Sequence, residues 1–473
     1  MAVCEYCRST LIKDADSVKD IGKMSEVLED YSPIQISTSG SYEGKSFSVV
    51  GRIQLRYEDG FWNEWYLWFA DGSDGWLSDA SGQFVVTRLR GTLPAAPKFE
   101  SLGPGAALKD GGARYVATDV RTARCTGGQG ELPVRVGAGW QAKVADFRSA
   151  DRFITLDYSD GEVPQVYAGG AVSLDDLRPQ LLRSDDEIAR TAGRYKGKTT
   201  TLACPSCGGG VEYQAGVAPF VVCKSCHAEL DCTGDTAAVL NKQAELSRVP
   251  IASALGGSLA LGDEATVEGQ RYRLIGLMRC QETGPNAEPD STWVEYLLFS
   301  ERQGFLWLVE SQDRWDKVRV LNQLPEQPSP NSVRVGDQTY TKLYDYGSKV
   351  VYAAGSFNWR VSVGDATRIT DYQSGNRKVT SETSEHEINW SRSEQVPQAA
   401  VWQWFGKKQG AGRQPLSVAQ PQPAGSLYGA AKTLTVLFLL LNAPFLFVSG
   451  SAVGALLLGL VLLWVPALIY KRS

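Results

Sequence analysis

The chain carries one long stretch of sequence twice. Gly44 opens the segment GKSFSVVG, and Gly269 opens the related segment GQRYRLIG. Asp146 and Asp371 are separated by the same number of positions as these two glycines. A constant offset over about a hundred residues indicates a duplication, because unrelated segments do not stay in register over that length. The chain must therefore fold as two copies of one domain.

Each copy shows the two-residue period of antiparallel sheet. Ile53, Leu55 and Tyr57 alternate with polar residues, which is typical of half-buried strands. Residues 305–309, FLWLV, are apolar throughout, and such a segment suits a strand covered on both faces. Thirteen Trp and nineteen Tyr beside three Met favour aromatic-rich strands over a helical bundle. We expect a mainly β fold with two homologous antiparallel β domains, and the sequence leaves open whether each is a barrel or a sandwich.

Two Cys-x-x-Cys pairs lie between the copies, with fifteen residues separating them. This is the spacing of a four-thiolate zinc ribbon. Gly208 follows the first pair, where such a knuckle needs a positive φ angle, and residues 211–213 and 220–222 are expected to form hairpin strands. Zn²⁺ takes four soft ligands in a tetrahedron, and a site with no open position is structural. The predicted zinc ligands are Cys204, Cys207, Cys223 and Cys226.

Two other interpretations of these cysteines stay open. The thiols could be buried or joined in disulfides, and His227 could replace one cysteine as a ligand. Six of the nine cysteines fall in Cys-x-x-Cys pairs, which favours metal binding in a reducing compartment. Cys232 falls outside the pairs and is interpreted as a small hydrophobic residue.

The N-terminus repeats the second knuckle alone. Residues 1–11, MAVCEYCRSTL, match residues 220–230, FVVCKSCHAEL. Cys4 and Cys7 offer two thiolates, and half a ribbon does not complete a tetrahedral site. We expect the reading frame to begin roughly twenty to thirty residues upstream, with another Cys-x-x-Cys pair that completes the tetrahedron. Otherwise Cys4 and Cys7 must find metal ligands on a partner chain.

A short linker helix is predicted after each knuckle. Apolar residues recur every three to four positions between Val18 and Leu28, and residues 239–246 repeat this pattern more weakly. That spacing places apolar side chains on one face of a helix. A proline follows each segment and would end the helix.

The C-terminal region changes character twice. Residues 407–426 are rich in Gly, Gln, Pro and Ala, which predicts a flexible tether. From Leu434 to Tyr470 the chain carries no charge, and one helix of that length would measure about 55 Å, beyond a hydrocarbon core of about 30 Å. A break at Ser449–Ser451 gives a transmembrane hairpin, and basic residues at both ends place them in the cytosol. One long tilted helix is the alternative.

These observations divide the chain into nine segments. They are a half zinc ribbon (1–13), a linker helix (14–32), the first β domain (33–180), a linker (181–201), the zinc ribbon (202–232), a linker helix (233–249), the second β domain (250–406), a flexible tether (407–432) and the transmembrane hairpin (433–470).

Charge and histidine content weigh against nucleic-acid binding and against catalysis. Lys and Arg number 48 against 53 Asp and Glu, for a net charge of −5, so the chain lacks the basic footprint of a nucleic-acid-binding protein. The acid–base candidates are Asp146, Asp371 and His386 with its neighbours Glu385 and Glu387. His386 has no counterpart in the first copy. We expect no catalytic activity and no nucleic-acid partner.

The duplicated segments resemble a bacterial family known as domain of unknown function 4178. The resemblance rests on the Gly-x-x-aromatic openings before Gly51 and Gly276, on the Trp-x-Glu-aromatic strands at Trp62 and Trp293, and on the ribbon. Such proteins often carry ribbons, duplicated domains and terminal transmembrane helices. Their genes tend to lie near those for polyamine-synthesis-like enzymes and membrane or membrane-remodelling proteins. The resemblance implies an accessory role at the inner membrane and supplies no catalytic residues.

Two functions are therefore expected. The first is a zinc-binding scaffold or adaptor, anchored in the lipid bilayer of the inner membrane with its soluble part facing the cytoplasm and with membrane or cytosolic protein partners. The second is a binding module for a polyamine-like cation. Trp62 and Glu64, with their copies Trp293 and Glu295, would combine a carboxylate with an aromatic face, as cation sites do. Alternatively, the rings pack in the core and Glu64 pairs with an arginine.

Overall fold

The protein is described by a computed structural model. The described residues are 2–3, 9–14, 17–23, 27 and 32–407, apart from gaps at 81, 135, 138, 185–186, 189–200, 214–217, 219, 233–236, 243–256, 286, 288–290, 301–302 and 312–313. The chain divides into a unit over residues 1–409 and a unit over residues 410–473, and every described residue belongs to the first. The predicted membrane hairpin and nearly all of the tether lie outside the described residues. Within the described part, no helix is both long and apolar enough to cross a bilayer.

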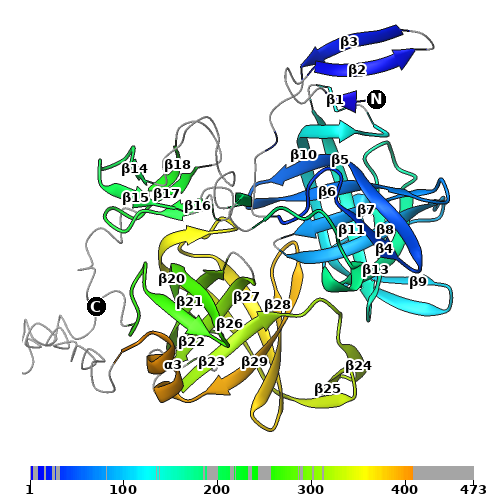
Figure 1. Ribbon diagram of the computed structural model, residues 1–473. Coiled ribbons are helices and arrows are strands. Elements are labelled where there is room, and N and C mark those ends of the chain that lie inside the picture. The colour runs from blue at the N-terminus through cyan, green and yellow to red at the C-terminus, as the bar shows by residue number, and fades with distance from the viewer. Residues whose placement is uncertain are drawn as a thin grey trace, which may run out of the picture. The chain divides into compact units, whose positions relative to one another are not determined.

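The first β domain is a closed antiparallel barrel (Figure 1). Its strands are β5 (Lys45–Tyr57), β6 (Gly60–Phe69), β7 (Asp74–Ala80), β8 (Gln83–Thr92), β10 (Ala113–Glu131), β11 (Trp140–Ser149), β12 (Arg152–Asp157) and β13 (Gln165–Val172). Around the ring they run β5-β6-β7-β8-β13-β12-β11-β10, and pairing of β10 with β5 closes it. Accessory elements are β4 (Ser39–Tyr42), β9 (Ala107–Asp110) and the short 3₁₀ helices η1 (Phe99–Ser101) and η2 (Asp175–Leu177).

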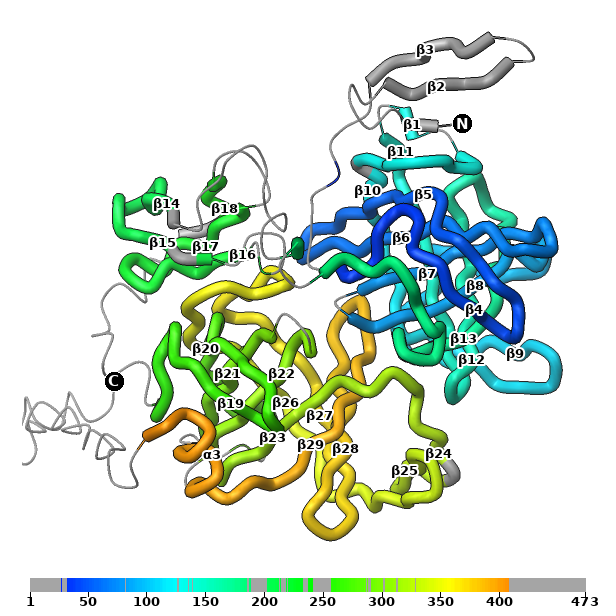
Figure 2. Tube along the Cα trace, viewed as in Figure 1, coloured from blue at the N-terminus to red at the C-terminus, as the bar shows by residue number. Residues whose placement is uncertain are grey.

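The second domain repeats this ring (Figure 2). Its strands are β20 (Gln270–Thr283), β21 (Thr292–Ser300), β22 (Gly304–Ser311), β23 (Arg314–Val320), β26 (Gln338–Phe357), β27 (Ala366–Ser374), β28 (Arg377–Thr383) and β29 (Ile388–Val396). The order is β20-β21-β22-β23-β29-β28-β27-β26, closed by β26 on β20. Accessory elements are β19 (Glu264–Val267), β24 (Glu326–Ser329), β25 (Ser332–Val335) and α3 (Gln398–Trp404). The expectation of two homologous β domains is confirmed, and the choice between barrel and sandwich is resolved as a barrel.

A glycine sits at the closing seam of each barrel. Gly51 pairs with Gly130 across the first seam, and Gly276 pairs with Gly355 across the second. A Cβ atom on Gly51 would lie 1.9 Å from the carbonyl oxygen of Glu131, and one on Gly276 would lie 2.5 Å from a backbone oxygen of the facing strand. Both glycines also follow a register shift in the pairing with the next strand. Glycine is therefore required because the backbones approach closely where the sheet bends shut.

The barrel walls are covered on their outer faces. In the first barrel, Trp65 and Leu67 of β6 pack against Ile34 and Leu177, which lie outside the ring. In the second, Leu306 and Leu308 of β22 belong to a cluster that includes Val401 and Trp402 of α3. Phe305 and Trp307 of β22 belong to a different cluster on the opposite face. The expectation that residues 305–309 form a strand covered on both faces is thus confirmed.

The cysteine pairs of residues 204–226 lie in a separate set of short strands, which we call the four-cysteine unit. It comprises β14 (Thr201–Ala203), β15 (Gly210–Glu212), β16 (Phe220–Val222), β17 (Ala228–Asp231) and β18 (Ala238–Lys242). Strands β14 and β15 form one hairpin, and β16 and β17 form another. Each knuckle therefore has its own hairpin, rather than the two sharing one as the sequence predicted. Strand β16 also pairs with β26, which joins the unit to the second barrel.

The N-terminal strands repeat the second hairpin. They are β1 (Ala2–Val3), β2 (Ser9–Asp14) and β3 (Ser17–Lys23). Val3 pairs with Gly130 of β10, as Val222 of β16 pairs with Gly355 of β26. These two pairings are equivalent in the duplication, because Gly130 and Gly355 are separated by the same offset as Gly44 and Gly269.

The predicted linker helices are wrong where the structure describes them. Residues 17–23 form β3, which pairs with β2, and residues 238–242 form β18, which pairs with β17. Both strands extend an open sheet edge, and the backbone hydrogen bonds gained there outweigh a weak helical spacing in a short segment. Both pairings also contain a register shift, and a bulge of this kind disturbs the two-residue period by which a strand is recognised.

Candidate metal centre and barrel carboxylates

The two knuckles of the four-cysteine unit have the same backbone geometry. Gly208 follows the first pair with a φ angle of 75°, as predicted, and His227 follows the second with a φ angle of 56°. The N–H of Gly208 donates to the carbonyl of Cys204 over 2.7 Å, and the N–H of His227 donates to that of Cys223 over 2.8 Å. The tight turn of each knuckle therefore places its two thiols on the same side of that turn.

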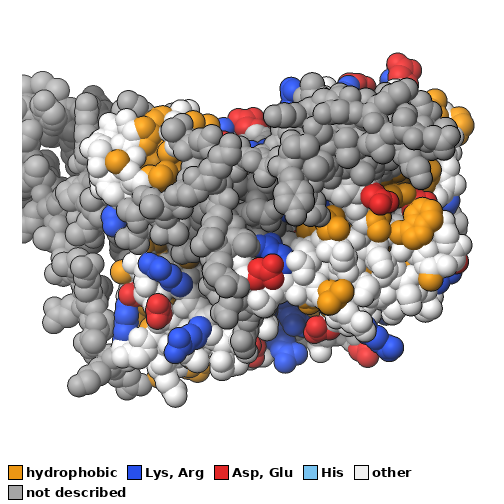
Figure 3. Space-filling view, turned by 45° about the horizontal axis from the view of Figure 1, so that its top comes forward, with side chains coloured by type: hydrophobic (Ala, Val, Ile, Leu, Met, Phe, Trp, Pro, Cys, Tyr) orange, Lys and Arg blue, Asp and Glu red, His pale blue; other side chains and the backbone are white. Residues whose placement is uncertain are grey.

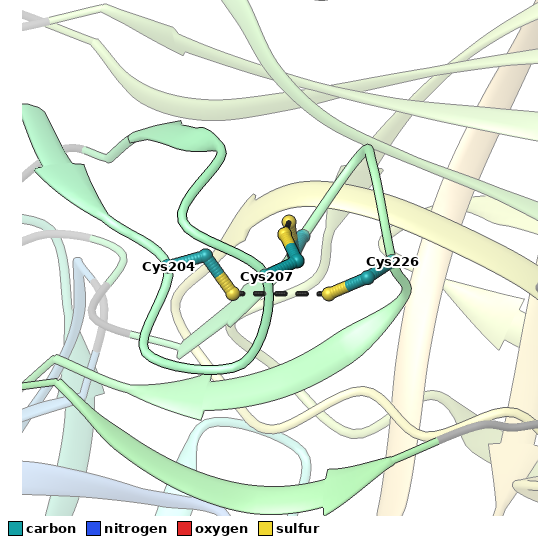
Figure 4. Close-up of side chains that lie close together, drawn as sticks. Cys204, Cys207 and Cys226 are labelled. Carbon is teal, nitrogen blue, oxygen red and sulfur yellow. Dashed lines mark hydrogen bonds between the residues drawn. The ribbon is translucent and has the colours of Figure 1, made fainter.

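The four sulfur atoms converge on one point (Figure 4). Cys204 Sγ lies 3.8 Å from Cys226 Sγ, Cys207 Sγ lies 3.9 Å from Cys223 Sγ, and all four atoms fall within 4.8 Å of one another. A tetrahedron with metal–sulfur bonds of about 2.3 Å has edges of about 3.8 Å. A disulfide would bring two sulfurs to about 2.05 Å, and all four cysteines are free. The cluster is therefore suited to a metal ion and not to disulfides.

His227 is not part of this cluster. Its side chain is buried, and its ring lies 5.2 Å from the ring of Tyr352 in an edge-on contact. The residues whose ligand atoms meet are the four cysteines. The alternative with histidine as a ligand is not supported. Cys4 and Cys7 lie outside the described residues.

Burial disfavours a negative charge on the Cys223 thiol unless a cation is present. Partial burial raises the pKa of the Cys223 thiol to about 12. An isolated thiol there stays protonated at neutral pH, whereas a divalent cation stabilises the thiolate and drives the proton off. At neutral pH the Cys223 side chain therefore favours the thiolate form only together with a bound metal.

A buried ion pair joins the four-cysteine unit to the second barrel. Glu229 of β17 is 2% exposed and accepts a hydrogen bond of 2.8 Å from Ser362 Oγ. The guanidinium of Arg360 lies 3.5 Å from the same carboxylate. Together with the β16–β26 pairing, these contacts hold the four-cysteine unit against the end of the barrel. Sequence reasoning missed Glu229 and Arg360, because their pairing joins segments far apart in the chain.

The Trp-x-Glu pairs predicted from the sequence are in contact. Trp62 Nε1 donates to Glu64 Oε1 over 2.8 Å, and Trp293 Nε1 donates to Glu295 Oε1 over 2.6 Å. Glu64 also accepts from Ser78 Oγ over 2.7 Å. The expected arginine partner of Glu64 is therefore replaced by an indole and a hydroxyl. Trp65 lies on the other face of β6, with Arg52 stacked 4.8 Å from its ring centre.

These glutamates point into the barrels. Glu64 of β6 and Asp157 of β12 stand on opposite walls of the first ring, yet the Asp157 charge adds to desolvation in raising the pKa of Glu64. Glu295 of β21 and Glu382 of β28 stand on opposite walls of the second ring, and the Glu295 charge likewise adds to desolvation in raising the pKa of Glu382. Side chains on opposite walls influence one another in this way only when both project inward.

The inward-facing carboxylates occupy the same positions in both barrels. Asp157 and Glu382 are related by the same offset as Asp146 and Asp371. Thr155 Oγ1 donates to Asp146 over 2.7 Å, and Thr380 Oγ1 donates to Asp371 over 2.6 Å. Sequence reasoning missed the equivalence of Asp157 and Glu382 because the residue types differ. The constant offset between the two copies would have identified Asp157 and Glu382 as equivalent positions.

Burial keeps several of these carboxyls protonated at higher pH than usual. Desolvation raises the pKa of Glu64 to about 7, despite the opposing hydrogen bonds from Ser78 and Trp62. Desolvation also raises the pKa values of Glu295 and Asp146. The barrels thus hold groups that change charge near neutral pH. Of the remaining acid–base candidates, Glu385 and His386 are exposed, and Glu387 is half-buried and accepts a hydrogen bond of 2.7 Å from Arg121.

A comparison with protein families finds the duplication independently. The model described as "Domain of unknown function (DUF4178)" matches residues 35–174 and residues 260–398. These two ranges contain the two barrels, and together they cover more than half of the chain. The resemblance inferred from the sequence is therefore confirmed. No curated protein sequence matches the chain.

Proposed function

The chain belongs to the family of the domain of unknown function DUF4178, which it contains twice, and from that premise we propose that it is a non-catalytic, zinc-binding scaffold or adaptor. In this proposal the four-cysteine unit holds one structural Zn²⁺. The barrels present surfaces to protein partners, and the C-terminal segment anchors the chain in a bacterial inner membrane with its barrels in the cytoplasm.

The observation that carries the proposal is the closed thiol cluster fixed to a barrel. The sulfur spacings of 3.8 and 3.9 Å match the edge of a zinc–thiolate tetrahedron, and four protein ligands leave Zn²⁺ no position for a substrate or a reactive water. A closed site of this kind supplies rigidity rather than chemistry. The metal-bearing unit continues the sheet of the second barrel through β16 and β26, so the metal would stiffen the end of that barrel.

The membrane part of the proposal rests on the uncharged segment from Leu434 to Tyr470. We expect the full-length chain to stay with membranes after an alkaline carbonate wash, and a chain that ends at Lys407 to be released. Reporter fusions placed before Lys432 and after Ser473 should both report a cytosolic location. A periplasmic report after Ser473 would indicate a single crossing, and release of the full-length chain by carbonate would contradict anchoring.

The adaptor part is tested on the same material. The tagged full-length chain, solubilised from those membranes in mild detergent, should co-purify with a defined protein in near-stoichiometric amount by mass spectrometry. Recovery of the chain without such a partner would contradict the adaptor role.

A second candidate is binding of a polyamine-like cation inside the barrels. It is favoured by the repeated placement of inward-facing carboxylates next to indole rings, at Glu64 with Trp62 and at Glu295 with Trp293. A cationic ligand would ionise these carboxyls and would contact the aromatic faces. The raised pKa of Glu64 means that binding would release a proton near neutral pH.

Titration calorimetry with spermidine tests this candidate. Wild-type protein should bind spermidine with a heat that varies with the ionisation enthalpy of the buffer. The double variant Glu64→Gln/Glu295→Gln should bind at least tenfold more weakly, and the exposed-site control Glu162→Gln should bind like wild type. Equal binding by all three proteins, or by none, would remove the candidate.

A further inference from the structure

The seam of the first barrel is closed over a shorter length than the seam of the second. In the second barrel, β20 and β26 pair over eight positions. In the first barrel, the described pairing of β5 with β10 covers four positions and ends at Gln54 with Gly127. Through the duplication, the other four pairs of the second barrel would join residues 55–58 to residues 122–125 in the first. We call these two segments the seam gap, because the backbone pairing of the wall stops there.

The turn between β28 and β29 of the second domain lies beside this gap. The N–H of Val120 on β10 donates to the carbonyl of His386 over 3.0 Å, and Asp119 pairs with Glu387 as an isolated bridge. The Glu387 carboxylate lies 2.7 Å from the guanidinium of Arg121. Strand β11 occupies the other edge of β10 over the same residues. The turn therefore lies on the edge of β10 that faces β5.

The turn keeps its shape through its own hydrogen bonds. The N–H of Ser384 donates to the carbonyl of Glu387 over 2.9 Å, and Ser384 Oγ accepts from the N–H of Glu387 over 3.2 Å. Among the described residues, its polar contacts with β10 are the backbone hydrogen bond, the bridge and the ion pair given above. Glu385 and His386 at its tip are exposed. A segment with internal hydrogen bonds and few outside contacts can move as one piece.

The inward carboxylates of the first barrel lie next to the turn. Asp119 pairs with Asp146 across β10 and β11, so their side chains stand on the same face. The Asp146 charge in turn adds to desolvation in raising the pKa of Glu64. On the face shown in Figure 3, by contrast, the described acidic and basic side chains are interspersed. The negative groups that would hold a cation are therefore gathered inside the barrel, and a cation needs a route to them.

We propose that the turn of residues 384–387 is a gate at the seam gap, and that its displacement opens a side entrance to the carboxylates inside the first barrel. The ion pair between Arg121 and Glu387 holds the gate shut. The entrance admits small cations of the polyamine class, and this part rests on the cation-binding candidate given above. The continuous pairing of β20 with β26 gives the second barrel no corresponding entrance, so the two copies differ in access.

Two buried cysteines report whether the entrance opens. Cys125 lies at the seam gap, and Cys280 lies in the paired seam of the second barrel. Full-length protein is treated with a methanethiosulfonate reagent that carries a trimethylammonium group, and peptide mass spectrometry follows the modification rate of each cysteine. Glu387→Ala should raise the rate at Cys125 by roughly tenfold or more, because loss of the ion pair makes opening more frequent, and should leave the rate at Cys280 unchanged. Glu385→Ala removes an exposed carboxylate of the same turn and should behave like wild type.

Two results would overturn the gate. One is an equal rate at Cys125 in wild type, Glu387→Ala and Glu385→Ala. The other is an equal acceleration at Cys125 and Cys280 in Glu387→Ala, since the substitution would then have loosened the whole chain. The titration with spermidine described above tests the ligand separately. Faster modification of Cys125 in a chain that binds no spermidine would support the gate and contradict the cation.

Discussion

Replacing Cys223 with serine should release one metal ion per chain and unfold the four-cysteine unit. A structural zinc site contributes on the order of 10 kcal/mol to the folding of a ribbon-sized unit, and the short strands β14 to β18 have a small core of their own. Serine offers no soft thiolate, so the tetrahedron loses a ligand. Metal analysis by inductively coupled plasma mass spectrometry on protein purified without chelator measures the first effect.

Loss of the metal should also destabilise the adjoining end of the second barrel. Ala218 and Val222 belong to the same apolar cluster as Leu297 and Phe299 of β21, so an unfolded unit exposes the end of that barrel to water. Hydrogen exchange should therefore speed up in β14 to β18 and, to a smaller extent, in β21 and β26. The first barrel should exchange at its wild-type rate.

Cys232→Ser is the matched control. Cys232 is buried in the same small core as Cys204 and Cys223 but is not among the four converging thiols. This variant should keep its metal. Equal metal content in Cys223→Ser and Cys232→Ser, or no zinc in wild type, would contradict a zinc site at these cysteines.

The cysteine cluster was predictable because its geometry is local. Each knuckle is fixed by a tight turn between near neighbours in the chain, and Gly208 marked the positive φ angle of the first one in the sequence. The second knuckle uses His227 in that conformation, which sequence alone does not indicate because few non-glycine residues adopt it. The two-residue period likewise predicted strands such as β5, since alternation is read from neighbouring residues.

Closure of the barrels was not predictable from these patterns. It depends on pairings between strands far apart in the chain, β5 with β10 and β8 with β13, and a two-residue period is the same in a barrel and a sandwich. The linker helices failed for a related reason, because β3 and β18 gain their hydrogen bonds from sheet edges built elsewhere. The duplication carried information about tertiary structure, since the positions kept at its constant offset include the seam glycines and two of the inward carboxylates, Asp146 with Asp371 and Asp157 with Glu382.

The second prediction with a large expected effect is that Glu64 makes the stability of the first barrel depend on pH. In the folded chain burial raises the pKa of this carboxyl to about 7 from a value of 4.5, which we take for the unfolded chain. Between these values the unfolded chain releases a proton that the folded chain retains. Stability therefore falls as pH rises through this window and levels off above pH 7. For the Glu64 carboxyl alone, the free energy of unfolding falls by about 2.5 kcal/mol between pH 5 and pH 8.

Glu64→Gln should abolish this part of the pH dependence. A glutamine amide stays neutral, accepts from Trp62 Nε1 and donates to Ser78 Oγ, so the variant keeps the local contacts of the protonated acid. The free energy of unfolding of the first barrel, measured by hydrogen exchange of β5 to β8 at pH 5 and pH 8, should drop by about 2.5 kcal/mol less in Glu64→Gln than in wild type.

The exposed carboxyl of Glu162 supplies the control, because Glu162→Gln changes the same functional group where water solvates it. This variant should keep the wild-type pH dependence. If Glu64→Gln and wild type lose the same stability between pH 5 and pH 8, the carboxyl of Glu64 is ionised throughout this range in the folded chain, which would contradict its raised pKa.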